Sequence, residues 1–131
     1  MPVKYQRNDG GRNDSSITGE QKDCTVRTYA RALNIPYDEA HSYFESKGRK
    51  KGKGIFFDNV VKDDDRFMKI TIPTSIYKNK PTVNQCIAYF NKGTYVFKVN
   101  HHVFVVKDGV LLDHIPPKPK QVVYYVMWVI V

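Results

Sequence analysis

The stretch from 102 to 113, His-Val-Phe-Val-Val-Lys-Asp-Gly-Val-Leu-Leu-Asp, carries the strongest signal for the fold of this chain. It contains two runs of β-branched and apolar residues, joined by Asp108-Gly109. An Asp-Gly loop between two such runs predicts a type I′ turn, because both of its central residues must adopt positive φ angles. The sequence therefore predicts an antiparallel hairpin with strands over 102–107 and 110–115.

The length of this turn also determines which side chains share a face of the hairpin. Side chains alternate along a strand, so a two-residue loop places His102 and Asp113 on the same face. As diagonal neighbours, their Cα atoms are expected about 7–8 Å apart, with the side chains within hydrogen-bond reach. His101 and His114 are expected on the opposite face, away from Asp113. A carboxylate beside an imidazole is either the orienting member of a catalytic triad or a structural hydrogen bond at a sheet end.

The segments that flank the hairpin predict one α+β domain over residues 1–131, with N-terminal helices packed on a C-terminal antiparallel sheet. Residues 1–20 are rich in Asn, Asp, Gly and Ser and are expected to form an irregular leader. Two further runs, Tyr95 to Val99 and Val122 to Ile130, have strand composition, and a third strand is expected over 67–72. Helical spacing of apolar residues is found in three segments: roughly 23–34, 36–48 and 82–92.

The two cysteines are predicted to lie in different environments. Cys24 falls in the first turn of the first predicted helix, outside its apolar stripe, where unpaired backbone N–H groups and the helix dipole lower a thiol pKa. Asp23 would raise that pKa unless its carboxylate caps the helix. Cys86 instead lies on the apolar face of the helix that begins after Thr82, whose capping box is completed by Gln85, and is expected in the core.

This order of residues resembles the papain-like cysteine peptidases. The segment around Cys24, the following Asn34-Ile35-Pro36-Tyr37, and the run 102–113 look like small bacteriophage-encoded proteins of that superfamily, which are similar to the C39-type bacteriocin-processing peptidases. The resemblance implies a papain-like fold, with Cys24 as nucleophile, His102 as base and Asp113 as the orienting acid. It implies no cofactor, and it implies a host cytoplasmic location if the chain is phage-encoded.

If the chain is such an enzyme, it cleaves a peptide, isopeptide or amide bond in a peptide or protein substrate through an acyl-enzyme. The Cys24 backbone N–H, with the Gln21 side chain, would hold the oxyanion. The alternative is that Cys24 is an ordinary reduced thiol and that His102 and Asp113 form a structural pair without catalysis.

A second hypothesis is a basic phage protein that binds nucleic acid or a host protein on the same scaffold without catalysis. The formal net charge is +8, which favours acidic partners. The Gly-rich loop 48–54 would contact phosphates through four side chains, with Tyr77, Lys78 and Lys80 alongside. These four are Arg49, Lys50, Lys51 and Lys53.

Metal binding is a weaker hypothesis, and no contact with a membrane is expected. The spacing of Cys24 and the four histidines matches no zinc motif, and His41, His101 and His114 are interpreted as incidental. No apolar run of about 18 residues occurs, and residues 1–20 lack the pattern of a signal peptide, so we expect an intracellular protein without a membrane span.

Overall fold

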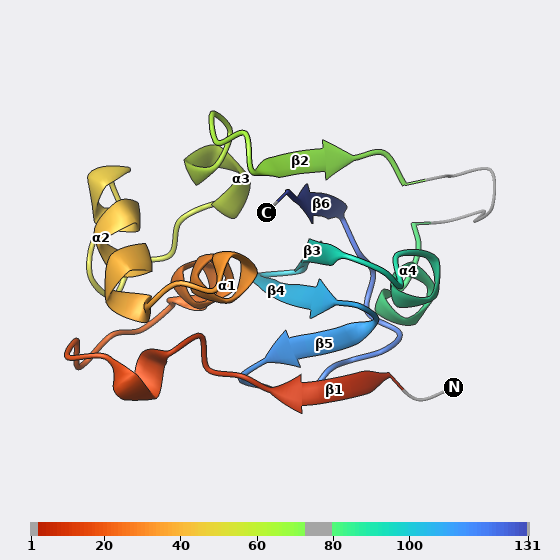
Figure 1. Ribbon diagram of the computed structural model, residues 1–131, viewed down its shortest axis with the longest axis horizontal. Coiled ribbons are helices and arrows are strands. Elements are labelled where there is room, and N and C mark those ends of the chain that lie inside the picture. The colour runs from red at the N-terminus through yellow and green to blue at the C-terminus, as the bar shows by residue number, and fades with distance from the viewer. Residues whose placement is uncertain (1–2, 73–79, 131) are drawn as a thin grey trace.

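A computed structural model describes residues 3–72 and 80–130 (Figure 1). The chain is an α+β protein with a six-stranded, mostly antiparallel mixed sheet in the order β1-β5-β4-β3-β6-β2. The α+β class predicted from the sequence is therefore confirmed. The strands are β1 (Lys4–Arg7), β2 (Phe67–Ile70), β3 (Thr94–Val99), β4 (His102–Lys107), β5 (Val110–Asp113) and β6 (Tyr125–Val129). The helices are α1 (Cys24–Leu33), α2 (Tyr37–Ser46), α3 (Phe57–Val60) and α4 (Val83–Tyr89), with a 3₁₀ turn over Arg12–Asp14.

The predicted hairpin forms β4 and β5 in the expected register. Val106 pairs with Leu111 and Lys107 with Val110. The φ angles of Asp108 and Gly109 are 49° and 81°, as a type I′ turn requires. Strand β5 ends at Asp113, two residues before the predicted end.

The sheet continues on both sides of the hairpin. Strand β3 pairs antiparallel with β4, and β6 pairs with the other edge of β3 rather than extending the meander past β5. The leader was expected to be irregular, and this is wrong for Lys4–Arg7, which pairs parallel with β5. A strand of four residues has too little pattern to be recognised, because its partner lies far along the chain.

Helices cover both faces of the sheet. Helices α1, α2 and α3 lie over one face, where Val96, Val103 and Val105 belong to their core cluster. Helix α4 packs on the opposite face, where its Cys86 contributes to the second cluster. Cys86 is 1 % exposed, which confirms its predicted place in the core.

The helix ends follow their sequence signals. Helix α1 ends at Leu33 because Asn34 adopts a left-handed conformation with φ of 54°, and its N–H bonds the carbonyls of the last turn. Helix α4 begins with the predicted capping box between Thr82 and Gln85. Among residues 3–72 and 80–130, no helix is long and apolar enough to cross a membrane.

Candidate active site

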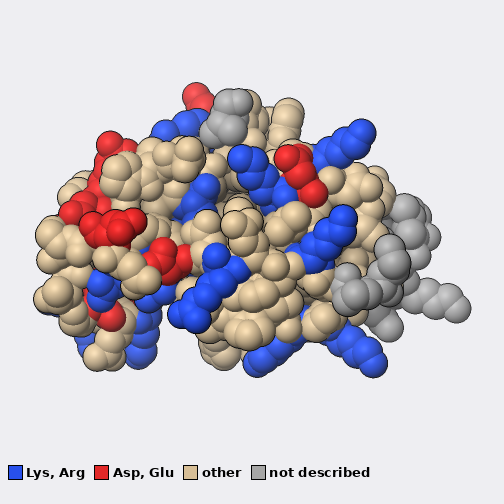
Figure 2. Space-filling view, turned by 60° about the horizontal axis from the view of Figure 1, so that its bottom comes forward, with Lys and Arg blue, Asp and Glu red and all other residues tan. Residues whose placement is uncertain are grey.

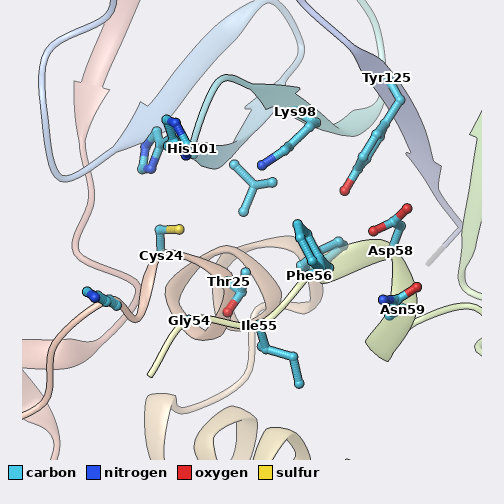
Figure 3. Close-up of a pocket in the computed structure, with 14 residues that line it drawn as sticks. Cys24, Thr25, Gly54, Ile55, Phe56, Asp58, Asn59, Lys98, His101 and Tyr125 are labelled. Carbon is cyan, nitrogen blue, oxygen red and sulfur yellow. The ribbon is translucent and has the colours of Figure 1, made fainter. Parts of the chain in front are cut away.

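A cavity of about 650 Å³ lies at the N-terminal end of α1. Helix α1 contributes Cys24, the sheet contributes Lys98, His102 and Tyr125, and the segment before and within α3 contributes Phe56. Figure 3 shows the Cys24 sulfur pointing into this space, with Lys98 and Tyr125 reaching in from the sheet. The cavity therefore brings one end of a helix against the ends of several strands.

Cys24 is the first residue of α1, as the sequence predicted, and its thiol is free and half-buried. Asp23 precedes it but does not cap the helix with its side chain, contrary to one expectation. Its carboxylate instead accepts hydrogen bonds from Tyr37 Oη at 2.8 Å and Arg27 Nε at 3.2 Å. The negative charge beside the thiol is therefore occupied by donors from α1 and α2.

The predicted contact between His102 and Asp113 is confirmed. Nε2 of His102 lies 2.6 Å from Oδ2 of Asp113, whose side chain is almost fully buried. A buried carboxylate that stays ionised needs a donor, so Nε2 carries the proton and Nδ1 is left for exchange with the thiol. Of the adjacent residues His101 and His102, the predicted hairpin register therefore identified the one that contacts Asp113.

The expected placement of His114 is wrong. Its Nδ1 lies 3.1 Å from Oδ1 of Asp113, and its backbone N–H donates to the same oxygen at 2.8 Å. Strand β5 ends at Asp113, so side-chain alternation does not continue into His114. Arg31 of α1 adds a cation whose Nη2 is 3.8 Å from Oδ1. Asp113 is consequently surrounded by donors and positive charge.

These surroundings shift three pKa values. Burial raises the pKa of Asp113, but hydrogen bonds from His102 and His114 outweigh it and hold the pKa at about 2. Burial lowers the pKa of His102, but the hydrogen bonds with Asp113 and Cys24 raise it to about 9. Burial also opposes ionisation of Cys24, yet the hydrogen bond and charge of His102 lower the pKa of this thiol below its ordinary value.

Cys86 provides the contrast. Burial alone raises the pKa of its thiol to about 12, and its surroundings are apolar. Only Cys24, of the two cysteines, lies where a thiolate is stabilised.

Gln21, the predicted oxyanion donor, is not brought to the cavity. Its side chain is exposed, and Lys22 lines the cavity in its place. Its backbone carbonyl accepts a hydrogen bond from Arg49 Nη2 at 3.0 Å, which fixes the segment just before α1. Among the described residues, the Cys24 backbone N–H remains the predicted donor for an oxyanion.

The predicted basic surface over loop 48–54 requires a correction. Arg49 is 4 % exposed, and its two terminal nitrogens bind the Glu20 carboxylate at 3.0 and 3.1 Å. Its guanidinium is not available to contact phosphates, because it is buried and hydrogen-bonded to Glu20. Lys50, Lys51 and Lys53 are exposed. On the face in Figure 2, Lys and Arg are scattered rather than gathered in one patch.

Other residues of the basic hypothesis have different outcomes. Tyr77 and Lys78 lie outside the described residues. Lys80 is exposed and its Nζ lies 4.6 Å from the ring centroid of Tyr124. His41, interpreted as incidental, is buried with Nε2 2.6 Å from Glu20 Oε2. It therefore belongs to the same ionic cluster as Arg49.

The sequence reasoning missed Lys98 and Tyr125 as cavity residues. Lys98 is a charged residue within the largely apolar strand β3. It lies on the same face of the strand as Val96, which is buried in the core. A lysine on the inward face of a strand was the available signal. In the part of the chain that the structure describes, no group of three or more His, Cys, Asp or Glu side chains is arranged to hold a metal ion.

Comparison with known proteins gives no relative for this chain. No family model matches it, and neither a curated protein nor a solved structure matches it.

Proposed function

We propose that this chain is a thiol hydrolase that cleaves a peptide, isopeptide or amide bond, with Cys24, His102 and Asp113 as its catalytic triad. The observation that carries the proposal is geometric: Cys24 and His102 line the same cavity, and Nε2 of His102 lies 2.6 Å from Oδ2 of Asp113. Two opposed pKa shifts support it. The pKa of the Cys24 thiol is lowered while that of the His102 ring is raised to about 9, each partly through the other. Such a pair favours a thiolate and an imidazolium at neutral pH.

The reaction follows from the placement of these groups. The Cys24 thiolate adds to the carbonyl carbon of the substrate, and the developing oxyanion accepts a hydrogen bond from the Cys24 backbone N–H. His102 gives its proton to the leaving amine as the C–N bond breaks, which leaves a thioester. His102 then removes a proton from water, whose oxygen attacks the thioester and releases the carboxylic acid and the Cys24 thiolate, which restores the thiolate–imidazolium pair. Asp113 orients the ring and stabilises its charged form.

A papain-like architecture is part of this proposal. It is supported by the order of elements, with the thiol at the start of a helix and the imidazole and carboxylate on later antiparallel strands. The resemblance to small bacteriophage-encoded proteins of that superfamily points the same way. We propose on this resemblance a location in the cytoplasm of a host cell.

The test uses p-nitrophenyl acetate, an activated ester that separates acylation from turnover. We expect rapid acetylation of Cys24, detected by peptide mass spectrometry, followed by steady release of acetate. Cys24→Ser should abolish both, whereas Cys86→Ser should retain both because Cys86 lies in the opposite core. His102→Ala should slow acylation and deacylation. Acetylation that never turns over, or that occurs equally on both cysteines, would refute hydrolysis at this site.

A non-catalytic binding role is the second candidate, supported by exposed Lys50, Lys51 and Lys53 on one loop of a chain with net charge +8. This role predicts affinity for an oligonucleotide that falls steeply with salt. It also predicts loss of that affinity when the three lysines are changed to Gln. Binding without ester turnover would favour this second candidate over the hydrolase.

A further inference from the structure

Lys98 occupies an unusual place for a charged residue. It lies on β3, a central strand, and pairs with Val103 of β4 and Tyr125 of β6. The next row on the same face, Val105, Val96 and Met127, is fully buried in the core under α1. Lys98 is partly buried and lines the cavity at the end of this apolar row, so its ammonium is placed to pair with an anion bound there.

The described part of the protein supplies no carboxylate for this ammonium. Among the residues that the structure describes, no carboxylate lies within 4.0 Å of the Lys98 side-chain nitrogen. Asp58 lines the same cavity, but its carboxylate is 3.6 Å from Lys69 Nζ. The positive charge of Lys98 instead helps to lower the pKa of the Cys24 thiol. Lys22 lies on the wall and adds further positive charge.

Two further features of the cavity match a ligand with both polar and apolar parts. Thr25 lines the cavity, and its buried hydroxyl has no hydrogen-bond partner among residues 3–72 and 80–130. An unsatisfied buried hydroxyl is unusual in a folded protein and marks the polar part of this wall. Phe56, on the opposite wall, leaves two thirds of its surface exposed (67 %). Figure 3 shows Phe56 across the cavity from Lys98.

We propose that the substrate carries a carboxylate close to the scissile carbonyl, which pairs with Lys98, and an apolar group that packs on Ile55 and Phe56. The substrate class is thus an acidic peptide, with the carboxylate on a side chain or at a free C-terminus. This inference rests on the proposed function, because it takes Cys24 as the reacting group. Lys98 is then the residue that determines specificity, through direct contact with the carboxylate of the substrate.

The experiment compares two reagents that alkylate Cys24 by the same displacement of iodide. Iodoacetate carries a carboxylate next to the reacting carbon, and iodoacetamide carries a neutral amide of similar size. Lys98→Gln raises the thiol pKa and slows both reagents, but this effect cancels in the ratio of their rates. We expect the iodoacetate to iodoacetamide ratio to fall about fivefold in this variant, as for loss of one partly exposed ion pair.

Two variants control for charge and for folding. Lys98→Arg keeps the cation and should keep most of the ratio. Lys107→Gln removes an exposed lysine from the other end of the hairpin and should leave the ratio unchanged. If Cys24 reacts no faster than Cys86 with either reagent, the proposed function itself fails. If Cys24 is selectively alkylated but Lys98→Gln leaves the ratio unchanged, only the present inference is overturned.

Two peptides distinguish the sources of the carboxylate. N-acetyl-Phe-Asp-amide has only a side-chain carboxylate, and N-acetyl-Phe-Ala has only a C-terminal one. Protection of Cys24 from iodoacetamide by the first assigns an internal acidic residue, and protection by the second assigns a free C-terminus. Each effect should be lost in Lys98→Gln. Protection by neither peptide overturns the inference.

Discussion

At the scale of single residues, the Asp113 carboxylate influences the protonation of His102 in the candidate active site. Its carboxylate is 2 % exposed and is bonded by His102 and His114, with Arg31 close by. An ionised carboxylate in such a place is stable only while its donors remain. It therefore raises the pKa of His102, and the charge of His102 in turn lowers the pKa of the Cys24 thiol. The three residues form one electrostatic unit.

His102→Ala tests the last link of this unit. Without the imidazolium, the pKa of the Cys24 thiol should return toward 9.0 or above, because burial then acts with less opposition. We expect alkylation by iodoacetamide at pH 7 to slow by about tenfold or more, in line with the smaller thiolate fraction. Mass spectrometry of the two cysteine peptides measures this, with Cys86 as the internal control. An unchanged rate would show that His102 does not ionise the thiol.

Asp113→Asn tests the first link. The amide has a similar shape but no charge, so the pKa of His102 should fall from about 9 by at least one unit. Titration of the His102 ring by NMR measures the shift directly. Its matched control is Asp108→Asn, in the turn of the same hairpin, which should leave the His102 pKa unchanged. A His102 pKa that stays near 9 in Asp113→Asn would assign the shift to Cys24 instead.

The His102–Asp113 contact was predictable because everything that sets it is local. An Asp-Gly turn fixes the register, and the register fixes the pair. Lys98 and Arg49 were not recognised, because their environments are made by segments far away in the chain. From the sequence, Arg49 is one basic residue of a solvated loop. In the structure, its guanidinium pairs with the Glu20 carboxylate.

At the scale of elements, the loop after α2 is attached to the segment that leads into α1. Both terminal nitrogens of Arg49 bind Glu20, and the Gly52 N–H donates to the same carboxylate at 2.7 Å. The donation from Arg49 to the Gln21 carbonyl adds a second attachment point. The loop thereby positions the residues that immediately precede Cys24.

Arg49→Met should consequently destabilise the fold. It leaves the Glu20 carboxylate buried beside His41 without its main partner, and breaking a buried ion pair in this way costs about 3–5 kcal/mol. Urea unfolding measures the change, and Lys51→Met, on the exposed part of the same loop, serves as the control with an effect below about 0.5 kcal/mol. Equal effects of the two substitutions would contradict the anchoring role of Arg49.

Elements with strong local signals were predicted and weak ones were not. Helix α4 has a capping box and an apolar stripe, and the hairpin has its turn, so both were located to within a few residues. Strand β1 has four residues and lies at a sheet edge, parallel to a strand about a hundred positions later. Such pairing depends on tertiary contacts rather than on local preference.

At the scale of the whole molecule, the pH dependence of the free energy of unfolding should reflect the opposed pKa shifts of Cys24 and His102. Between about pH 6.5 and 9, the unfolded chain has a neutral imidazole and a protonated thiol, hence one proton on the pair. In the folded chain, the raised pKa of His102 makes the imidazole bind more protons than in the unfolded chain, and the lowered pKa of Cys24 makes the thiol bind fewer. The two shifts therefore act in opposite directions on the pH dependence of stability and partly cancel.

Cys24→Ala removes the thiol proton from this balance. The folded variant still binds a proton on His102, because Asp113 keeps its pKa raised, while the unfolded variant loses that proton above about pH 6.5. The stabilisation is complete below pH 6.5 and is lost as the pH rises toward the folded pKa. We expect the free energy of unfolding of Cys24→Ala to fall over this range by about 1.4 kcal/mol for each unit by which the His102 pKa stays raised, more steeply than that of wild type. Urea unfolding from pH 6 to 9 measures this; Cys86→Ala should run parallel to wild type, and a parallel curve for Cys24→Ala would contradict the ion pair.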